Sequence, residues 1–136
     1  MNRPILLAYL LLTGCSDTAT GALLMVAPNL TLQLMQLRAV PEALVFLSFI
    51  GAFVFSIGLS SLYGAYVAYR GDSRTKVETV WLLTAFTRAS VAIFVTQQVL
   101  AMTLDAGWLT VAATDGVCVL IQAIGLRRGW LVHAER

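Results

Sequence analysis

Apolar residues run almost without interruption through four long segments of the chain. These segments are residues 5–27, 43–69, 77–101 and 108–126. About 20 apolar residues, at a rise of 1.5 Å per residue, are enough for a helix to cross the hydrocarbon layer of a bilayer. In lipid, a helix satisfies the polar groups of its own backbone within one segment. The pattern therefore predicts an all-α fold, a bundle of four transmembrane helices.

The segment between the first two spans, residues 29–40, has a different pattern. Leu30, Leu34 and Leu37 fall on one helical face, whereas the glutamines between them are polar. The segment is too short to cross a bilayer. Amphipathic helices of this kind lie in the membrane interface, so we expect a short interfacial helix here. The strict alternation at the start of the segment would also suit a strand.

The composition supports a membrane protein and excludes several other classes. The chain has 136 residues, of which 59% are hydrophobic and 12% charged, and its mean hydropathy is +0.83. Soluble domains carry about 25% charged residues. A soluble enzyme, a nucleic-acid binder and a disordered chain are therefore excluded. The length predicts one integral membrane domain over residues 1–136, with the lipid bilayer as its first partner.

The basic residues are distributed unequally between the two ends of the predicted spans. The end that holds the N-terminus carries Arg3, Arg70, Arg74, Lys76, Arg127, Arg128 and Arg136, and the other end carries Arg38. Basic loops stay in the cytoplasm. We therefore expect a multi-pass protein of the bacterial inner membrane with both termini cytoplasmic. This bias accounts for the net charge of +2, so no nucleic-acid partner is needed to explain it.

Three ionisable residues lie far from the ends of the spans. Asp17, Arg88 and Asp115 fall near the middle of spans one, three and four. Each such charge costs about 2.5–3.5 kcal/mol at the bilayer centre, so all three are expected to meet inside the bundle. Arginine stays protonated. Two carboxylates and one guanidinium sum to −1, so we expect one aspartate to hold a proton.

Polar residues near these charges indicate either a binding site or a structural cluster. The candidate ligand-binding residues are Thr84, Gln98, Cys118 and Gln122. Intramembrane charges mark functional sites by default, but an ion cluster that fixes the register of the helices would show the same pattern. Cys118 and the second cysteine, Cys15, lie in apolar segments and indicate no disulfide or metal. The spans contain no histidine pair for haem and the chain no nucleotide-binding glycine loop, so no cofactor is indicated.

Small residues in the second span form a ladder at four-residue spacing. Its members are Ala52, Ser56, Ser60, Gly64 and Ala68. Small residues let the backbones of transmembrane helices approach closely. The ladder predicts either a contact inside the bundle or an interface between subunits.

The first span has an alternative interpretation as a processed segment. Leu12-Thr13-Gly14-Cys15 matches a lipoprotein cleavage box, in which Cys15 would be lipidated.

Several of these residues together resemble a known group of proteins. They are Gly21-Ala22-Leu23-Leu24-Met25-Val26-Ala27-Pro28, Glu42 ahead of Phe49-Ile50-Gly51-Ala52 and Gly58-Leu59, Arg88 in span three and the acid in span four. The chain resembles the small bacterial DoxX-like and DUF4345-like four-helix membrane proteins. The resemblance implies a four-helix fold and association with membrane redox complexes or quinones.

Three functions fit these observations. The first is an accessory subunit or a protein that binds a lipophilic molecule, quinone- or isoprenoid-like, as a homo-oligomer or in a larger membrane complex. The second is an enzyme on an isoprenoid or sterol-like epoxide or alkene, with epoxide hydrolase- or isomerase-type chemistry. Asp115 would be the base, Asp17 the acid and Arg88 their anchor, a charge pattern that resembles limonene-epoxide-type hydrolases. The third is a small proton-coupled transporter with Asp17 as the carrier.

Overall fold

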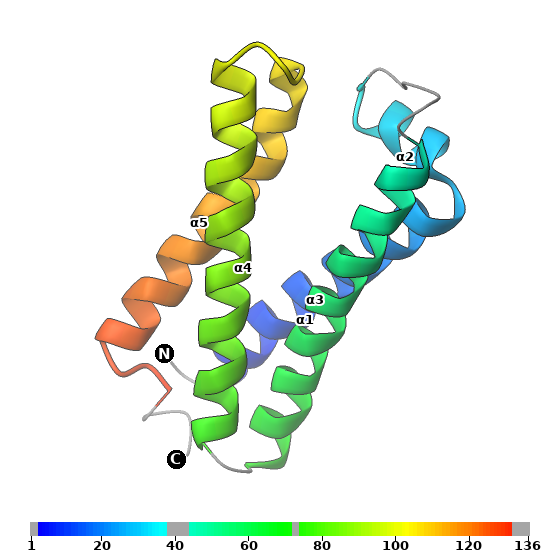
Figure 1. Cartoon of the computed structure of the whole chain (residues 1–136). Helices are drawn as coiled ribbons and strands as arrows, with labels where there is room; N and C mark the ends of the chain where they lie inside the picture. Colours follow the sequence, from blue (N-terminus) through cyan, green and yellow to red (C-terminus); the bar gives the residue numbers. More distant parts are fainter. Residues whose placement is uncertain (1–2, 38–43, 72–73, 132–136) are drawn as a thin grey trace.

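The described part of the chain forms four long helices and two short ones. The computed structural model describes residues 3–37, 44–71 and 74–131, which contain helices and turns and no strand. The elements are α1 (Arg3–Val26), α2 (Pro28–Leu34), α3 (Leu44–Arg70), α4 (Arg74–Leu100), the 3₁₀ helix η2 (Ala106–Trp108) and α5 (Leu109–Arg127) (Figure 1). Four helices are long and apolar enough to span a membrane, which confirms the predicted all-α bundle. Arg38, Glu42 and Arg136 lie outside the described residues.

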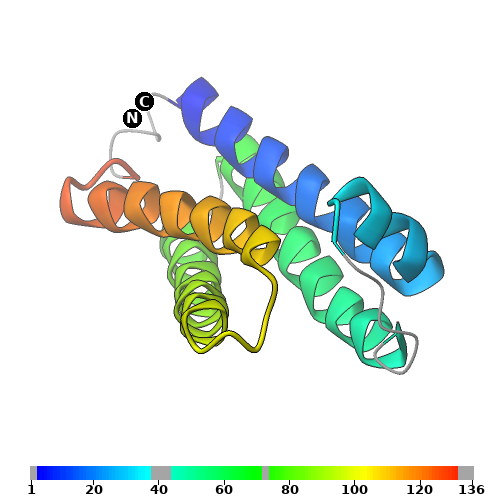
Figure 2. The same cartoon turned by 90° about the horizontal axis from the view of Figure 1, so that it is seen from above.

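The four long helices form two pairs. Helix α1 packs along α3, and α4 packs along α5 (Figures 1 and 2). The pairs meet near the ends of α1 and α4 that carry Arg3 and Arg74. There a buried apolar cluster joins the two pairs. It contains Leu6 and Leu10 of α1, Ala65 and Val67 of α3, Val77 and Trp81 of α4, and Leu131. From this contact the two pairs diverge toward the opposite end of the molecule (Figure 1).

Glycines bring α1 and α3 into close contact. A Cβ atom built on Gly21 would lie 2.7 Å from the backbone oxygen of Gly51, and one on Gly58 would lie 2.9 Å from that of Gly14. Atoms at such distances overlap, so no side chain fits at these positions without displacing a backbone. The two helices therefore pack through their main chains, as small residues allow in membranes.

The predicted small-residue ladder is only partly used for packing. Ala52, Ser56 and Ser60 are exposed, and only Gly64 and Ala68, near the basic end of α3, are buried or half-buried. Four residues turn a helix by about 40° more than a full circle, so a ladder at this spacing winds away from its partner. A seven-residue spacing drifts by only about 20°. The contact with α1 therefore follows Gly51 and Gly58 instead of the ladder.

The short helix after α1 ends earlier than the leucine pattern predicts. Gln36 has φ 57°, and the backbone N–H of Leu37 donates to the oxygen of Leu32 at 2.9 Å, which closes the helix. Leu37 consequently turns inward and packs with Leu32 and Leu47, and is not on one face with Leu30 and Leu34. Leu30 and Leu34 are exposed, and the location of α2 at a membrane interface stays a prediction.

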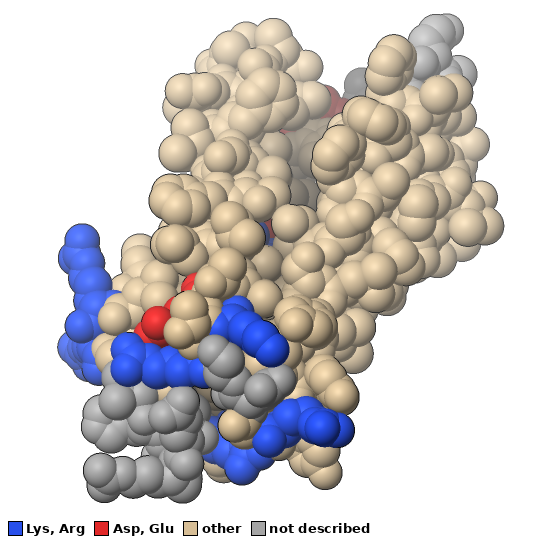
Figure 3. Space-filling model, turned by 60° about the horizontal axis from the view of Figure 1, so that its bottom comes forward, with Lys and Arg blue, Asp and Glu red and all other residues tan. Residues whose placement is uncertain are grey.

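The surface separates one basic end from an apolar remainder. Figure 3 shows lysine and arginine gathered at the end that faces the viewer, while most of the visible surface beyond it is uncharged. The described basic residues at this end are Arg3, Arg70, Arg74, Lys76, Arg127 and Arg128. Large exposed side chains along the helices are mostly hydrophobic, as lipid contact requires.

Candidate functional site

Three ionisable side chains from three helices meet between the two helix pairs. Arg88 of α4 donates from Nη1 to Oδ1 of Asp115 of α5 at 2.6 Å. Its second terminal nitrogen, Nη2, donates to Oδ2 of Asp17 of α1. One guanidinium thus holds two carboxylates, each on its own nitrogen, and the expected meeting of the three charges is observed. We call these three residues the ion cluster.

The ion cluster lies near the middle of the helices that supply it. At 1.5 Å per residue, Asp17 is about 21 Å from Arg3, Arg88 about 21 Å from Arg74, and Asp115 about 18 Å from Arg127. The hydrocarbon layer of a bilayer is about 30 Å thick. If the basic ends lie at one membrane surface, the three charges share one depth deep inside the membrane.

The ion cluster is not fully enclosed by protein. The Arg88 side chain is 6% exposed, but those of Asp17 and Asp115 are 19% and 15% exposed. Among the described residues, none donates a hydrogen bond to the second oxygen of either aspartate. Two carboxylate oxygens therefore remain available to a proton, a water molecule or a ligand. Figure 3 shows that the surface is hollowed between the two helix pairs.

Two of the predicted ligand-binding residues join α4 to α5. The indole N–H of Trp81 donates to the backbone oxygen of Gln122 at 2.9 Å. The amide of Gln122 donates to the backbone oxygen of Trp81 at 3.2 Å and to the Thr84 hydroxyl at 2.8 Å. Thr84 and Gln122 lie in the same α4–α5 seam as the ion cluster, toward the basic end. Oε1 of Gln122 is buried and has no partner among the described residues.

The other two predicted residues have different positions. Cys118 is buried one turn from Asp115 and borders the ion cluster, where its backbone oxygen faces the hydroxyl of Tyr9 at 3.5 Å. Gln98 lies about 15 Å from Arg88 along α4. Its Oε1 accepts from the Thr103 hydroxyl at 2.5 Å, in the turn after the helix. The structure therefore does not bring Gln98 to the ion cluster.

Tyr9 is a site residue that the sequence patterns missed. Its ring packs on that of Trp81 with centroids 5.1 Å apart, and it lies within electrostatic range of Arg88 and Asp17. Tyr9 precedes Asp17 by eight residues in α1, a spacing that keeps both within one broad stripe of the helix and could have revealed Tyr9. Together with the buried cluster around Trp81, it closes the space beside the ion cluster on the basic side.

The opposite end of the space is crossed by a second apolar contact. Trp108, the last residue of η2, packs against a buried cluster of Leu32 in α2, Leu37 just after it and Leu47 in α3. A Cβ atom on Gly107 would lie 2.6 Å from Cδ2 of Leu37, so η2 contacts the turn that follows α2 at this point. The ion cluster lies between this contact and the Tyr9–Trp81 contact.

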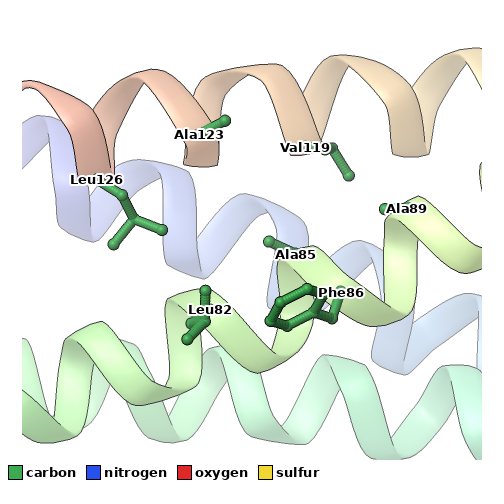
Figure 4. Close-up of a pocket in the computed structure, with 7 residues that line it drawn as sticks. All are labelled: Leu82, Ala85, Phe86, Ala89, Val119, Ala123 and Leu126. Atoms are coloured by element: carbon green, nitrogen blue, oxygen red, sulfur yellow. The ribbon is translucent and has the colours of Figure 1, made fainter.

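A separate groove lies on the surface of the α4–α5 pair. It has a volume of about 190 Å³ and includes no residue of the ion cluster (Figure 4). It is lined by Leu82, Ala85, Phe86, Ala89, Val119, Ala123 and Leu126. These side chains carry no polar atom, so the groove offers only apolar contact and no recognition of a polar group.

Metal binding finds no support in the part of the chain that the structure describes. No three histidine, cysteine, aspartate or glutamate side chains there are close enough to share a metal ion. The groups that meet at the ion cluster are two carboxylates and a guanidinium, with the hydroxyl of Tyr9 and the thiol of Cys118 nearby. No family model, no curated protein and no solved structure matches this chain.

Proposed function

We propose that this protein binds a lipophilic small molecule within the bacterial inner membrane, with the polar group of that molecule held at the ion cluster. The observation that carries the proposal is the pair of carboxylate oxygens without partners at mid-span, on side chains that are still 15–19% exposed. A cluster that served only to lock helix register would gain stability by enclosing these oxygens, because unpaired polar groups are costly in lipid.

The ligand would enter laterally, between the helix pairs, and lie along their apolar surfaces. The contact of Tyr9 with Trp81 would bound the ligand on one side, and the packing of Trp108 against the leucine cluster would bound it on the other. We place the basic end in the cytoplasm, with both termini, because basic loops are retained there. The resemblance to DoxX-like proteins favours a quinone- or isoprenoid-like ligand and association with a larger membrane complex or a second copy of the chain.

The test is to identify molecules that co-purify with the protein in its native lipid. Membranes are extracted with a polymer that retains lipid, and bound molecules are analysed by mass spectrometry. We expect a lipophilic species enriched with the wild type and reduced at least tenfold in Asp17→Asn and Asp115→Asn. Ser56→Ala is the matched control, because Ser56 is exposed and bonds only to the backbone of its own helix.

The proposal fails if the extracts of the wild type and of both aspartate variants contain the same molecules in the same amounts. Folding of each variant is verified first by its helical circular dichroism and its elution as one species. Conservative asparagine substitutions are used because they keep the shape of the side chain and one acceptor oxygen while removing the charge.

A second candidate function is acid–base catalysis on a lipophilic substrate. It is favoured by the geometry of Arg88, which holds two carboxylates on adjacent nitrogens of one guanidinium. An ionised Asp115 would activate water, and a protonated Asp17 would donate to an epoxide oxygen. Turnover of an isoprenoid epoxide by the wild type, lost in Asp115→Asn, would support this function, and turnover retained in Asp115→Asn would refute that assignment.

A further inference from the structure

We propose that the ion cluster selects a lipophilic cation, an ammonium group on an apolar body, and releases a proton when that cation binds. This inference rests on the proposed function and narrows it, since at the same site it favours an ammonium ligand over the uncharged quinone- or isoprenoid-like ligand that the family resemblance implies. It follows from the charges around the ion cluster.

The ion cluster has one more negative than positive group. Helix α1 contributes Asp17 and the hydroxyl of Tyr9, α4 contributes Arg88, and α5 contributes Asp115 and the thiol of Cys118. The described ionisable residues of α3 are Tyr63, Tyr66, Tyr69 and Arg70, all near its basic end. No described residue at this depth therefore balances the second carboxylate.

An unbalanced charge at the bilayer centre is unfavourable, so the empty site has to acquire a positive charge. A proton on one aspartate supplies it when no ligand is present. An ammonium ligand supplies the same charge, and its entry allows both aspartates to ionise. The step breaks one carboxylic O–H bond and forms an ion pair between carboxylate and ammonium, and the proton leaves to water. No other bond changes.

Ligands of other charge lack this compensation. A sulfonate or a phosphate would bind Arg88 but would increase the excess negative charge of the ion cluster. A neutral alcohol can donate one hydrogen bond to a free carboxylate oxygen, but it adds no charge. The affinity order expected from the ion cluster is therefore cation, then neutral donor, then anion.

The experiment uses three probes that share a dodecyl chain: dodecyltrimethylammonium, dodecanol and dodecyl sulfonate. Each is equilibrated between phosphatidylcholine nanodiscs with and without the protein, and the amounts bound are quantified by mass spectrometry. The empty nanodiscs correct for partition into lipid. We expect the ammonium probe to bind at least tenfold better than dodecanol, and the sulfonate to show no excess over empty nanodiscs.

Proton release gives an independent measurement. Since one proton leaves for each cation bound, the affinity for dodecyltrimethylammonium should rise with pH by up to about tenfold per unit. A pH indicator in weak buffer should report about one proton per bound probe. Asp17→Asn and Asp115→Asn should each abolish the pH dependence. Glu78→Gln is the control with unchanged binding, because Glu78 pairs with Arg74 at the exposed basic end.

The outcomes separate this inference from the proposed function. If dodecanol or the sulfonate binds as well as the ammonium probe, the site binds lipophilic molecules but does not select cations. If no probe exceeds the empty nanodiscs, both the inference and the proposed function fail. Should the aspartate variants not fold, a wild-type affinity for the ammonium probe that is the same at pH 6 and pH 8 refutes the inference on its own.

Discussion

Replacing Arg88 with glutamine should destabilise the protein more than any single change at its surface. Arg88→Gln removes the guanidinium that holds Asp17 and Asp115, and leaves their carboxyl groups, one of them ionised, without a counter-charge at mid-span. Removing one partner of a buried ion pair costs about 3–5 kcal/mol, because the remaining charge is uncompensated. We expect the free energy of unfolding to fall by this amount, with protonation of the aspartates at low pH recovering part of it.

The measurement is reversible unfolding by sodium dodecyl sulfate in mixed micelles, followed by circular dichroism. Arg74→Gln is the matched control, because Arg74 pairs with Glu78 through side chains that are 42% and 34% exposed. An exposed pair within one helix contributes about 0.3–0.5 kcal/mol. The neutral triple variant Asp17→Asn, Arg88→Gln, Asp115→Asn should recover most of the stability lost in Arg88→Gln, since no unpaired charge remains.

The result that would refute this reasoning is a small effect. Suppose Arg88→Gln and Arg74→Gln lower the unfolding free energy equally, within about 0.5 kcal/mol. The charges of the ion cluster are then screened by solvent, as those of an exposed ion pair are. The aspartates would then be solvated rather than held in the bundle. A triple variant as unstable as Arg88→Gln would show that the loss comes from packing of the arginine side chain and not from charge.

Three further predictions follow from packing and topology. Gly21→Ala should lower the unfolding free energy by about 1–3 kcal/mol, because its Cβ would overlap the backbone of α3. Gly116 has open space around it, so Gly116→Ala should be neutral or stabilising. Equal effects of the two substitutions in the same detergent titration would contradict this. Gln122→Met removes the amide hydrogen bonds between α4 and α5 and should cost about 0.6–1.7 kcal/mol, measured likewise. A fluorescent protein fused after Arg136 should fold in the cytoplasm, and a periplasmic phosphatase at the same position should be inactive; the opposite pattern would reverse the proposed orientation.

The features that the sequence predicts well are those fixed by large energies. Four apolar runs predict four spans because a lipid-exposed backbone must form helices. The meeting of Asp17, Arg88 and Asp115 could be predicted because three isolated charges in lipid would be too costly. Each of these expectations depends on where a residue lies in the sequence and on a free-energy cost of several kcal/mol for exposing a polar group to lipid.

The features that the sequence misses depend on rotation and local chain reversal. The ladder through Ser56 predicts a contact inside the bundle or an interface between subunits, and its four-residue spacing turns most of it to the outside of α3, away from the first of these. Leu37 follows the leucine pattern but lies beyond a turn at Gln36 with positive φ, which nothing in the local sequence demands. Such details are settled by small differences in packing between neighbouring helices.

The origin of Asp17 and Arg88 on different helix pairs has a consequence for biosynthesis. The two residues are 71 positions apart, so the first helix reaches the translocation channel with its acid unaccompanied. At 5–20 residues per second, its counter-ion follows about 4–14 s later. During this interval the apolar residues of the first helix, and then its glycine-mediated contact with α3, offset the cost of the unpaired acid. The ion cluster therefore forms only after the second half of the chain has been inserted.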